Sequence, residues 1–162
     1  MPTTNIEGIV VSYDHYRPTA DNGRQRIMYI HGTGCNSKVF AGHIGAIAEQ
    51  QEAVAVDLPG HGESEGNGFC SATEYAFFVG ALIKHLNWES CIVAGHSLGG
   101  GIALSLALYF RDLVAGLILI DTGARLRVNP KVLDLARKAA ENGSADIQAD
   151  SRFGYADSTS QH

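Results

Sequence analysis

A serine lies near the middle of the chain in the stretch VAGHSLGGG, residues 93–101. Gly95 and Gly99 flank Ser97 two positions away on either side, after an apolar run that indicates a strand and before a pattern that indicates a helix. To expose a serine oxygen at the carboxyl end of a strand the backbone must turn sharply, and side chains at positions 95 and 99 would collide. The pattern therefore predicts Ser97 as a nucleophile.

The predicted helix after Ser97 adds a second feature of acyl chemistry. Its first amide groups are free and its dipole is positive at that end, so the Leu98 N–H can help hold an oxyanion. A glycine-rich turn of this kind can instead bind phosphate, but a Walker loop has Lys and then Ser or Thr after its last glycine. Here Gly101-Ile102 stand in that place, which favours the nucleophile.

Two further loops upstream also follow apolar runs. The run ending at Ile30 leads into HGTGCNS, residues 31–37, where the Thr33 N–H is the candidate for a second oxyanion donor. The next run leads into DLPGHGES, residues 57–64. Ligands of open α/β sheets bind at the carboxyl ends of the strands, so we expect all three loops to open on one edge of the sheet.

Apolar runs and helical patterns alternate along the chain. The runs occupy residues 9–11, 27–30, 53–56, 91–94 and 117–120. They suit strands covered on both faces, which indicates a parallel sheet. Helical spacing marks residues 40–48 and 75–86, the latter behind a Ser71-x-x-Glu74 capping box. Residues 97–110 are apolar all round and predict a helix buried against the sheet. The fold class predicted is α/β, a mostly parallel sheet flanked by helices.

Together, HGTG, DLPGHGES and GHSLGG in this order resemble the α/β-hydrolase family, in its esterase, lipase and haloperoxidase-like branch, over roughly residues 6–128. The resemblance implies a serine hydrolase that cleaves an ester or related acyl bond of a small molecule, with Ser97 as nucleophile and the Leu98 and Thr33 amides as oxyanion hole. The residues that we expect to shape and orient the loops, rather than to act as the base, are His31, Gly32, Gly34, Asp57-Leu58-Pro59-Gly60, His61, Gly95, His96 and Gly99.

The partners of the nucleophile are harder to find. In this family the acid and the histidine follow the nucleophile along the chain, after the seventh and eighth strands. Residues 117–120 count as the sixth strand, and Asp121 at its end is the candidate acid, although a turn-capping role is favoured. His162 stands in a polar tail with nothing evident to hold it, whereas a triad base needs fixed geometry within about 3 Å of the serine.

These departures suggest an incomplete hydrolase core. Residues 1–123 are predicted to be its N-terminal part and residues 124–162 the start of a cap or a mobile tail. A second chain or a missing C-terminal segment would then supply the catalytic histidine. A truncated, non-catalytic binding module is the alternative, and so is a nucleotide-binding protein, since Gly32-x-Gly34-x-x-Ser37 precedes Asp57 by about twenty residues.

Composition narrows the classes of function. The net charge of −5, a pI near 5.7 and the lack of a Lys/Arg cluster argue against a nucleic-acid or anionic-membrane surface. The sequence has no leader-like segment and no apolar run of the roughly 18 residues that a membrane span needs. Cys35, Cys70 and Cys91 lack metal or redox spacing and predict free thiols in a reducing cytoplasm. No metal and no cofactor are expected.

Overall fold

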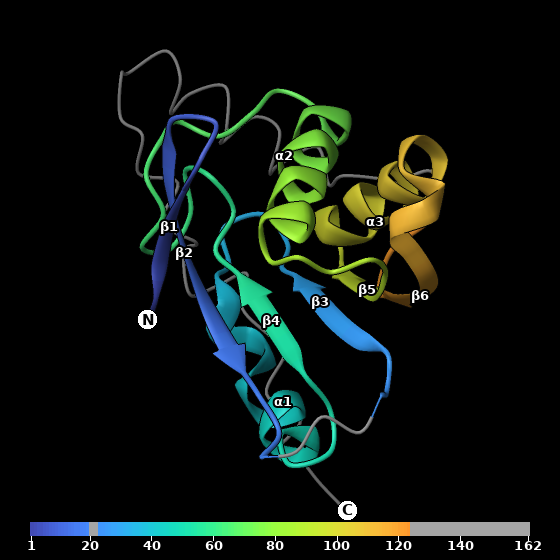
Figure 1. The fold of residues 1–162 in the computed structure, drawn as a ribbon. Coiled ribbons are helices and arrows are strands. Elements are labelled where there is room, and N and C mark those ends of the chain that lie inside the picture. The colour runs from blue at the N-terminus through green and yellow to red at the C-terminus, as the bar shows by residue number, and fades with distance from the viewer. Residues whose placement is uncertain (20–22, 124–162) are drawn as a thin grey trace, which may run out of the picture. The chain divides into compact units, whose positions relative to one another are not determined.

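The computed structural model describes residues 1–19 and 23–123 and shows a six-stranded sheet with helices on both faces (Figure 1). The strands are β1 (Thr3–Ile6), β2 (Ile9–Tyr16), β3 (Arg26–Ile30), β4 (Ala53–Val56), β5 (Cys91–His96) and β6 (Val114–Ile120). Their order across the sheet is β1-β2-β4-β3-β5-β6. The last four of these are parallel to one another, so the prediction of a mostly parallel α/β sheet is confirmed.

The first two strands differ from the prediction. β2 contains the apolar run 9–11 but pairs antiparallel with β4, and β1, which the sequence did not indicate, pairs antiparallel with β2. Glu7 and Gly8 join them with φ values of 51° and 89°, as in a two-residue type I′ hairpin. The prediction of a parallel strand at residues 9–11 was wrong because three apolar residues are too few to reveal strand direction.

Helices cover the two faces of the sheet (Figure 1). The helical elements are η1 (Ser37–Phe40), α1 (Ala41–Ile47), α2 (Ala72–His85), α3 (Leu98–Tyr109) and η2 (Arg111–Leu113). Successive side chains of β3 alternate between the faces. Tyr29 packs in one apolar cluster with Ile44 of α1, and Met28 packs in the other with Phe78 of α2. Both faces of the central strands are therefore covered, which explains why these strands read as continuous apolar runs.

The starts of α2 and η1 are capped by side chains. Ser71 Oγ accepts the Glu74 N–H at 3.2 Å, which confirms the N-cap half of the predicted capping box, and the Ser71 hydroxyl donates to Glu74 Oε2 at 2.8 Å. Asn36 Oδ1 accepts the Lys38 N–H at 3.1 Å in the same way. These caps fix where each helix begins after its loop.

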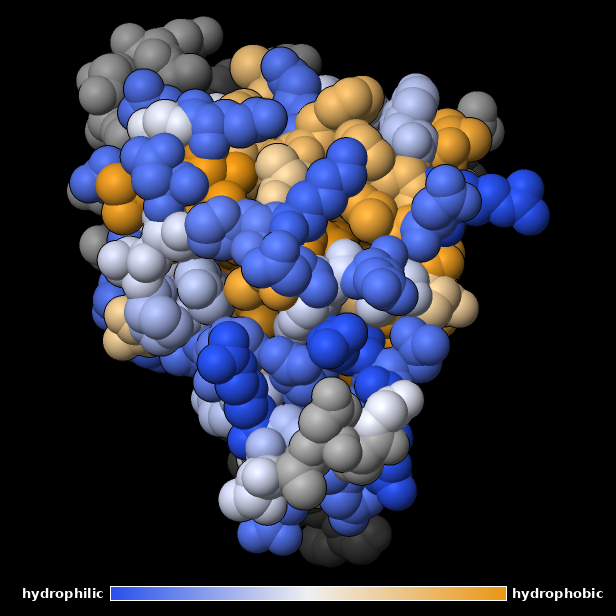
Figure 2. Space-filling model, in the orientation of Figure 1, coloured by the Kyte–Doolittle hydropathy of each residue, from blue (hydrophilic) through white to orange (hydrophobic). Residues whose placement is uncertain are grey.

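The far end of α3 differs from the prediction of a wholly buried helix. Ile102 and Leu106 are fully buried, but Leu108 and Tyr109 are 73% and 54% exposed. The exposed Phe77 ring of α2 lies 5.8 Å from the Tyr109 ring, and Figure 2 shows apolar side chains gathered over this part of the surface. The prediction was wrong here because only one face of the helix meets the sheet, and the described residues supply no layer outside it.

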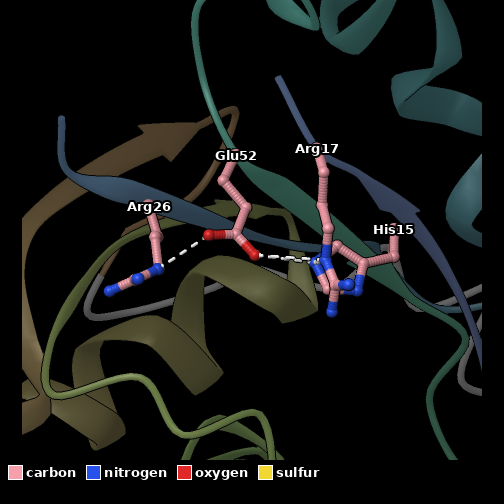
Figure 3. Close-up of polar contacts among 4 residues, drawn as sticks. All are labelled: His15, Arg17, Arg26 and Glu52. Carbon is pink, nitrogen blue, oxygen red and sulfur yellow. Dashed lines mark hydrogen bonds and ion pairs between the residues drawn. The ribbon is translucent and has the colours of Figure 1, made fainter. Parts of the chain in front are cut away.

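A charged network ties three strands together near the amino ends of β3 and β4 (Figure 3). Glu52 accepts from Arg26 Nε at 2.8 Å through one carboxylate oxygen and lies 2.8 Å from His15 Nε2 through the other. Arg17 Nε lies 3.7 Å from the second oxygen. Partial burial raises the pKa of Glu52, but the hydrogen bonds and positive charges of Arg26 and His15 outweigh it and hold that pKa below its ordinary value.

All described residues belong to one compact unit, Met1–Leu126. The predicted cap or tail at residues 124–162 lies outside the described residues, and so does His162. Within the described ranges, no helix is long and apolar enough to cross a membrane.

Candidate active site

Ser97 lies at the junction of β5 and α3 in a backbone conformation that serine rarely adopts. Its φ is 53° and its ψ is −115°, a conformation that costs of order 1–3 kcal/mol unless the surroundings hold it. A Cβ on Gly95 would lie 2.2 Å from the Gly99 carbonyl oxygen, and one on Gly99 would lie 2.1 Å from the Ile30 carbonyl oxygen. Both obstacles are backbone atoms and cannot rotate away, so the turn excludes every residue but glycine at these two positions.

The loop after β3 lies directly against Ser97. A Cβ on Gly32 would lie 3.0 Å from Ser97 Cβ and 3.1 Å from His96 Nδ1. The Cys35 N–H donates to the Gly32 carbonyl at 3.1 Å, and Gly34 has a φ of 71°, so the loop turns back tightly beyond Thr33. The structure thus brings Gly32, His96 and Ser97 together, with Thr33 next in the same loop.

Leu98 is the first residue of α3, and its N–H belongs to the turn whose amides have no acceptor within the helix. The helix dipole adds partial positive charge at the same point. α3 therefore begins directly after Ser97. The use of the Leu98 and Thr33 amides as oxyanion donors stays a prediction.

His31 is fully buried and connects two loops. The Leu58 N–H donates to its Nε2 at 3.0 Å, so this nitrogen is the acceptor and Nδ1 carries the proton, which it donates to the Gly32 carbonyl at 2.8 Å. Burial lowers the pKa of His31 to about 4, against the opposing effect of the Gly32 hydrogen bond. Both ring nitrogens are occupied, so the neutral imidazole has no lone pair left to take a proton from Ser97.

Asp57 joins the loop after β4 to the loop after β3. Its buried carboxylate accepts the Ser37 N–H at 2.7 Å and the Glu63 N–H at 2.9 Å. A Cβ on Gly62 would lie 2.2 Å from the same carboxylate, so a glycine there lets the loop close around it. This carboxylate therefore ties the two loops together at the edge of the sheet where Ser97 lies.

The other two histidines at this edge, His61 and His96, make no hydrogen bond with the Ser97 side chain in the part of the chain that the structure describes. The centroid of the His61 ring lies 5.1 Å from that of the His31 ring at an interplanar angle of 56°, and its Nδ1 lies 3.2 Å from the Pro59 carbonyl oxygen. His96 ends β5 and is half-buried. In residues 1–19 and 23–123 no histidine makes a hydrogen bond with the side chain of Ser97.

The loop after β6 contains a contact that the sequence did not reveal. Thr122 Oγ1 donates to the Ser97 carbonyl at 2.7 Å, and the Ser97 N–H donates to the Ile120 carbonyl at 3.1 Å. Asp121, between them, is exposed and has a φ of 49°. A threonine in a loop is too common to signal such a role, and the contact spans 25 positions of the chain.

The part of the chain that the structure describes holds no group of three or more His, Cys, Asp or Glu side chains placed to bind a metal ion. Its three cysteines are free, with Cys91 buried and Cys70 exposed.

Residues 25–152 match the family described as alpha/beta hydrolase fold. The chain belongs to this family. Among relatives of this alpha/beta hydrolase, the uncharacterized hydrolase YugF of Bacillus subtilis is 30% identical over 131 residues, which are 79% of this chain and 47% of the relative. The soluble epoxide hydrolase of a Corynebacterium species is 33% identical over 120 residues, 73% of this chain and 41% of the relative.

Solved structures also resemble this alpha/beta hydrolase over about half of their own length. A thermophilic esterase is 31% identical with a TM-score of 0.69, over 87% of this chain and 52% of that one. A thermophilic esterase from Thermogutta terrifontis is 26% identical with a TM-score of 0.71, over 86% and 50%. The chain spans 41–52% of the length of these relatives and solved structures.

Proposed function

We propose that this chain carries the nucleophile half of a serine hydrolase that cleaves an ester or related acyl bond of a small molecule. The observation that carries the proposal is Ser97 itself, held at a φ of 53° where β5 meets α3. A serine in a strained turn at the start of a helix is exposed to substrate and lies beside free amides. The likeness to two thermophilic esterases at 26% and 31% identity supports the same chemistry.

In the proposed reaction the Ser97 oxygen attacks the acyl carbon while a histidine base takes its proton. The electron pair of the carbonyl bond moves onto oxygen, and the amides of Leu98 and Thr33 stabilise that oxyanion. Collapse of the intermediate expels the leaving alcohol, which receives the proton from the histidine. Water then repeats these steps on the acyl-serine and releases the acid.

The histidine base belongs, in this proposal, to a missing C-terminal segment or to a second chain. β6 is the edge strand of the described sheet, and Leu117, Ile118 and Leu119 on it are 37–44% exposed. A strand added to this edge would end beside Thr122, which contacts Ser97. Asp121 lies at the same place as the candidate acid, and its positive φ also suits a purely conformational role in the turn.

Epoxide hydrolysis is the second candidate reaction, because one relative is a soluble epoxide hydrolase. In this fold that chemistry resembles ester formation on a carboxylate nucleophile, whereas position 97 is a serine. The serine favours acyl chemistry.

A fluorophosphonate probe, which phosphonylates activated serines, tests the proposal on the full chain, that is, this chain together with the segment or partner that supplies the histidine base. We expect Ser97 to be labelled and Ser97→Ala to be unlabelled, with Ser105→Ala on α3 as a control that removes another serine of the same region. Equal labelling of the wild type and Ser97→Ala would remove the assignment. A folded wild type that takes up no label and hydrolyses no aryl ester above the Ser97→Ala background would instead support the non-catalytic module.

A further inference from the structure

The backbone of Ser97 is held from outside its own strand and helix. Its N–H donates to the Ile120 carbonyl at 3.1 Å, and its carbonyl accepts from Thr122 Oγ1 at 2.7 Å. Asp121 separates these two partners and turns the chain with a φ of 49°, which brings both of them to the same residue. The last residue of β6 and the loop after it therefore hold both polar backbone groups of Ser97 in a clamp.

The clamped carbonyl also determines where an oxyanion donor points. The carbonyl of Ser97 and the N–H of Leu98 belong to one peptide group, which is trans and planar, so the two point in opposite directions. The Gly100 N–H at 3.0 Å and the Gly101 N–H at 3.4 Å hold this carbonyl from within the helix. The Thr122 hydroxyl makes the shortest of the three contacts and is the one that comes from another element.

The shape of Thr122 fits this role as well as its hydroxyl does. A Cβ on Gly100 would lie 2.1 Å from Thr122 Cγ2, so the methyl group packs directly over the first turn of α3. This close approach accounts for a glycine at position 100, which the turn around Ser97 does not itself require. The Thr122 methyl group thus packs against α3 while the Thr122 hydroxyl donates to the Ser97 carbonyl.

We propose that Thr122 is a positioning residue, which fixes the Ser97–Leu98 peptide group through its hydroxyl and so aims the Leu98 N–H at the oxyanion. The inference rests on the proposed function for its effect on rate, but the clamp itself is independent of catalysis. The step to which Thr122 contributes is stabilisation of the oxyanion, because the group that it orients touches the reacting oxygen.

Two substitutions separate the hydroxyl from the methyl group. Thr122→Val keeps the shape and removes the donor, whereas Thr122→Ser keeps the donor and removes the methyl. Thr3→Val, an exposed position on β1, is the matched control for the chemical change. Each variant is measured as the full chain by amide hydrogen exchange and by the second-order rate of fluorophosphonate labelling, with thermal unfolding recorded to show that it folds.

We expect Thr122→Val to speed exchange at the Ser97 and Gly100 amides relative to Val93, and to slow labelling by about 3- to 10-fold, the range that one net hydrogen bond corresponds to. Thr122→Ser should keep both the amide exchange rates and the labelling rate close to their wild-type values. The inference would be overturned if Thr122→Val showed the same amide exchange rates and labelling rate as the wild type. It would also be overturned if Thr122→Ser and Thr122→Val changed these rates equally. Faster exchange in Thr122→Val with no labelling of any folded protein would contradict the proposed function and leave the clamp supported.

Discussion

The strongest test of the loop architecture is the replacement of His31 by glutamine. His31 is fully buried, neutral and hydrogen-bonded at both ring nitrogens, and burial lowers its pKa to about 4. In the unfolded chain the ring takes up a proton as the pH falls below 6.5, whereas in the folded chain it does so only near pH 4. Between these values the unfolded state binds more protons, so the free energy of unfolding must decrease as the pH falls.

The size of this effect follows from the two pKa values. Each pH unit between them weakens the folded state by up to about 1.4 kcal/mol, so the loss approaches about 3 kcal/mol by pH 4. Because the ring is fully buried, solvent screening does not reduce this figure much. His31→Gln keeps an oxygen that can accept the Leu58 N–H but has no proton to gain, so the variant should lack this part of the pH dependence.

Urea unfolding from pH 7 to pH 4 measures the difference directly. Trp88 is the single tryptophan and is buried, so its fluorescence reports unfolding of this unit. We expect the free-energy gap between the wild type and His31→Gln to shrink by about 3 kcal/mol over this range. His43→Gln, which removes an exposed histidine of α1, shows how much comes from losing any histidine. Parallel pH profiles for the wild type and His31→Gln would refute the account of a neutral, buried connector.

Three further changes test other parts of the structure. Gly99→Ala places a Cβ against the Ile30 carbonyl, so it should abolish folding or lower the free energy of unfolding by more than about 3 kcal/mol. Gly42→Ala places its Cβ in open space on α1 and should raise the free energy of unfolding by up to about 1 kcal/mol. Chemical denaturation measures both changes. The pKa of Glu52 is lower in the folded chain than its unfolded value of 4.5, so Glu52 stabilises the fold above pH 4.5 and loses this effect as the pH falls through its folded pKa. Glu52→Gln should therefore destabilise the chain at pH 7 and have little effect at pH 3. Thermal unfolding at the two pH values measures the difference. Asp121→Asn keeps a residue that tolerates a φ of 49° and removes the charge, so fluorophosphonate labelling of Ser97 should persist; its loss would make Asp121 the acid.

Local signals in the sequence were enough to predict the central part of the fold. Glycines beside Ser97, the apolar run before it and the helical pattern after it all lie within about twenty residues, and the strand–turn–helix that they indicate is present. The Ser71 cap of α2 was predictable for the same reason. Such features depend on backbone conformation, which neighbouring residues largely determine.

Contacts between distant segments could not be predicted in this way. Thr122 meets Ser97 across 25 positions and Glu52 meets His15 across 37, and nothing in either segment marks its partner. The exposed end of α3 escaped prediction because its pattern reports only that the helix is apolar, not what covers it. These contacts arise from the order of strands in the sheet, which local patterns do not encode.

The most direct test of the central claim is a crystal structure of the full chain after treatment with the fluorophosphonate probe. We expect phosphorus bonded to Ser97 Oγ, with the phosphonyl oxygen about 2.7–3.1 Å from the backbone nitrogens of Leu98 and Thr33. Phosphorus on another side chain, or a phosphonyl oxygen directed away from both amides, would contradict the claim.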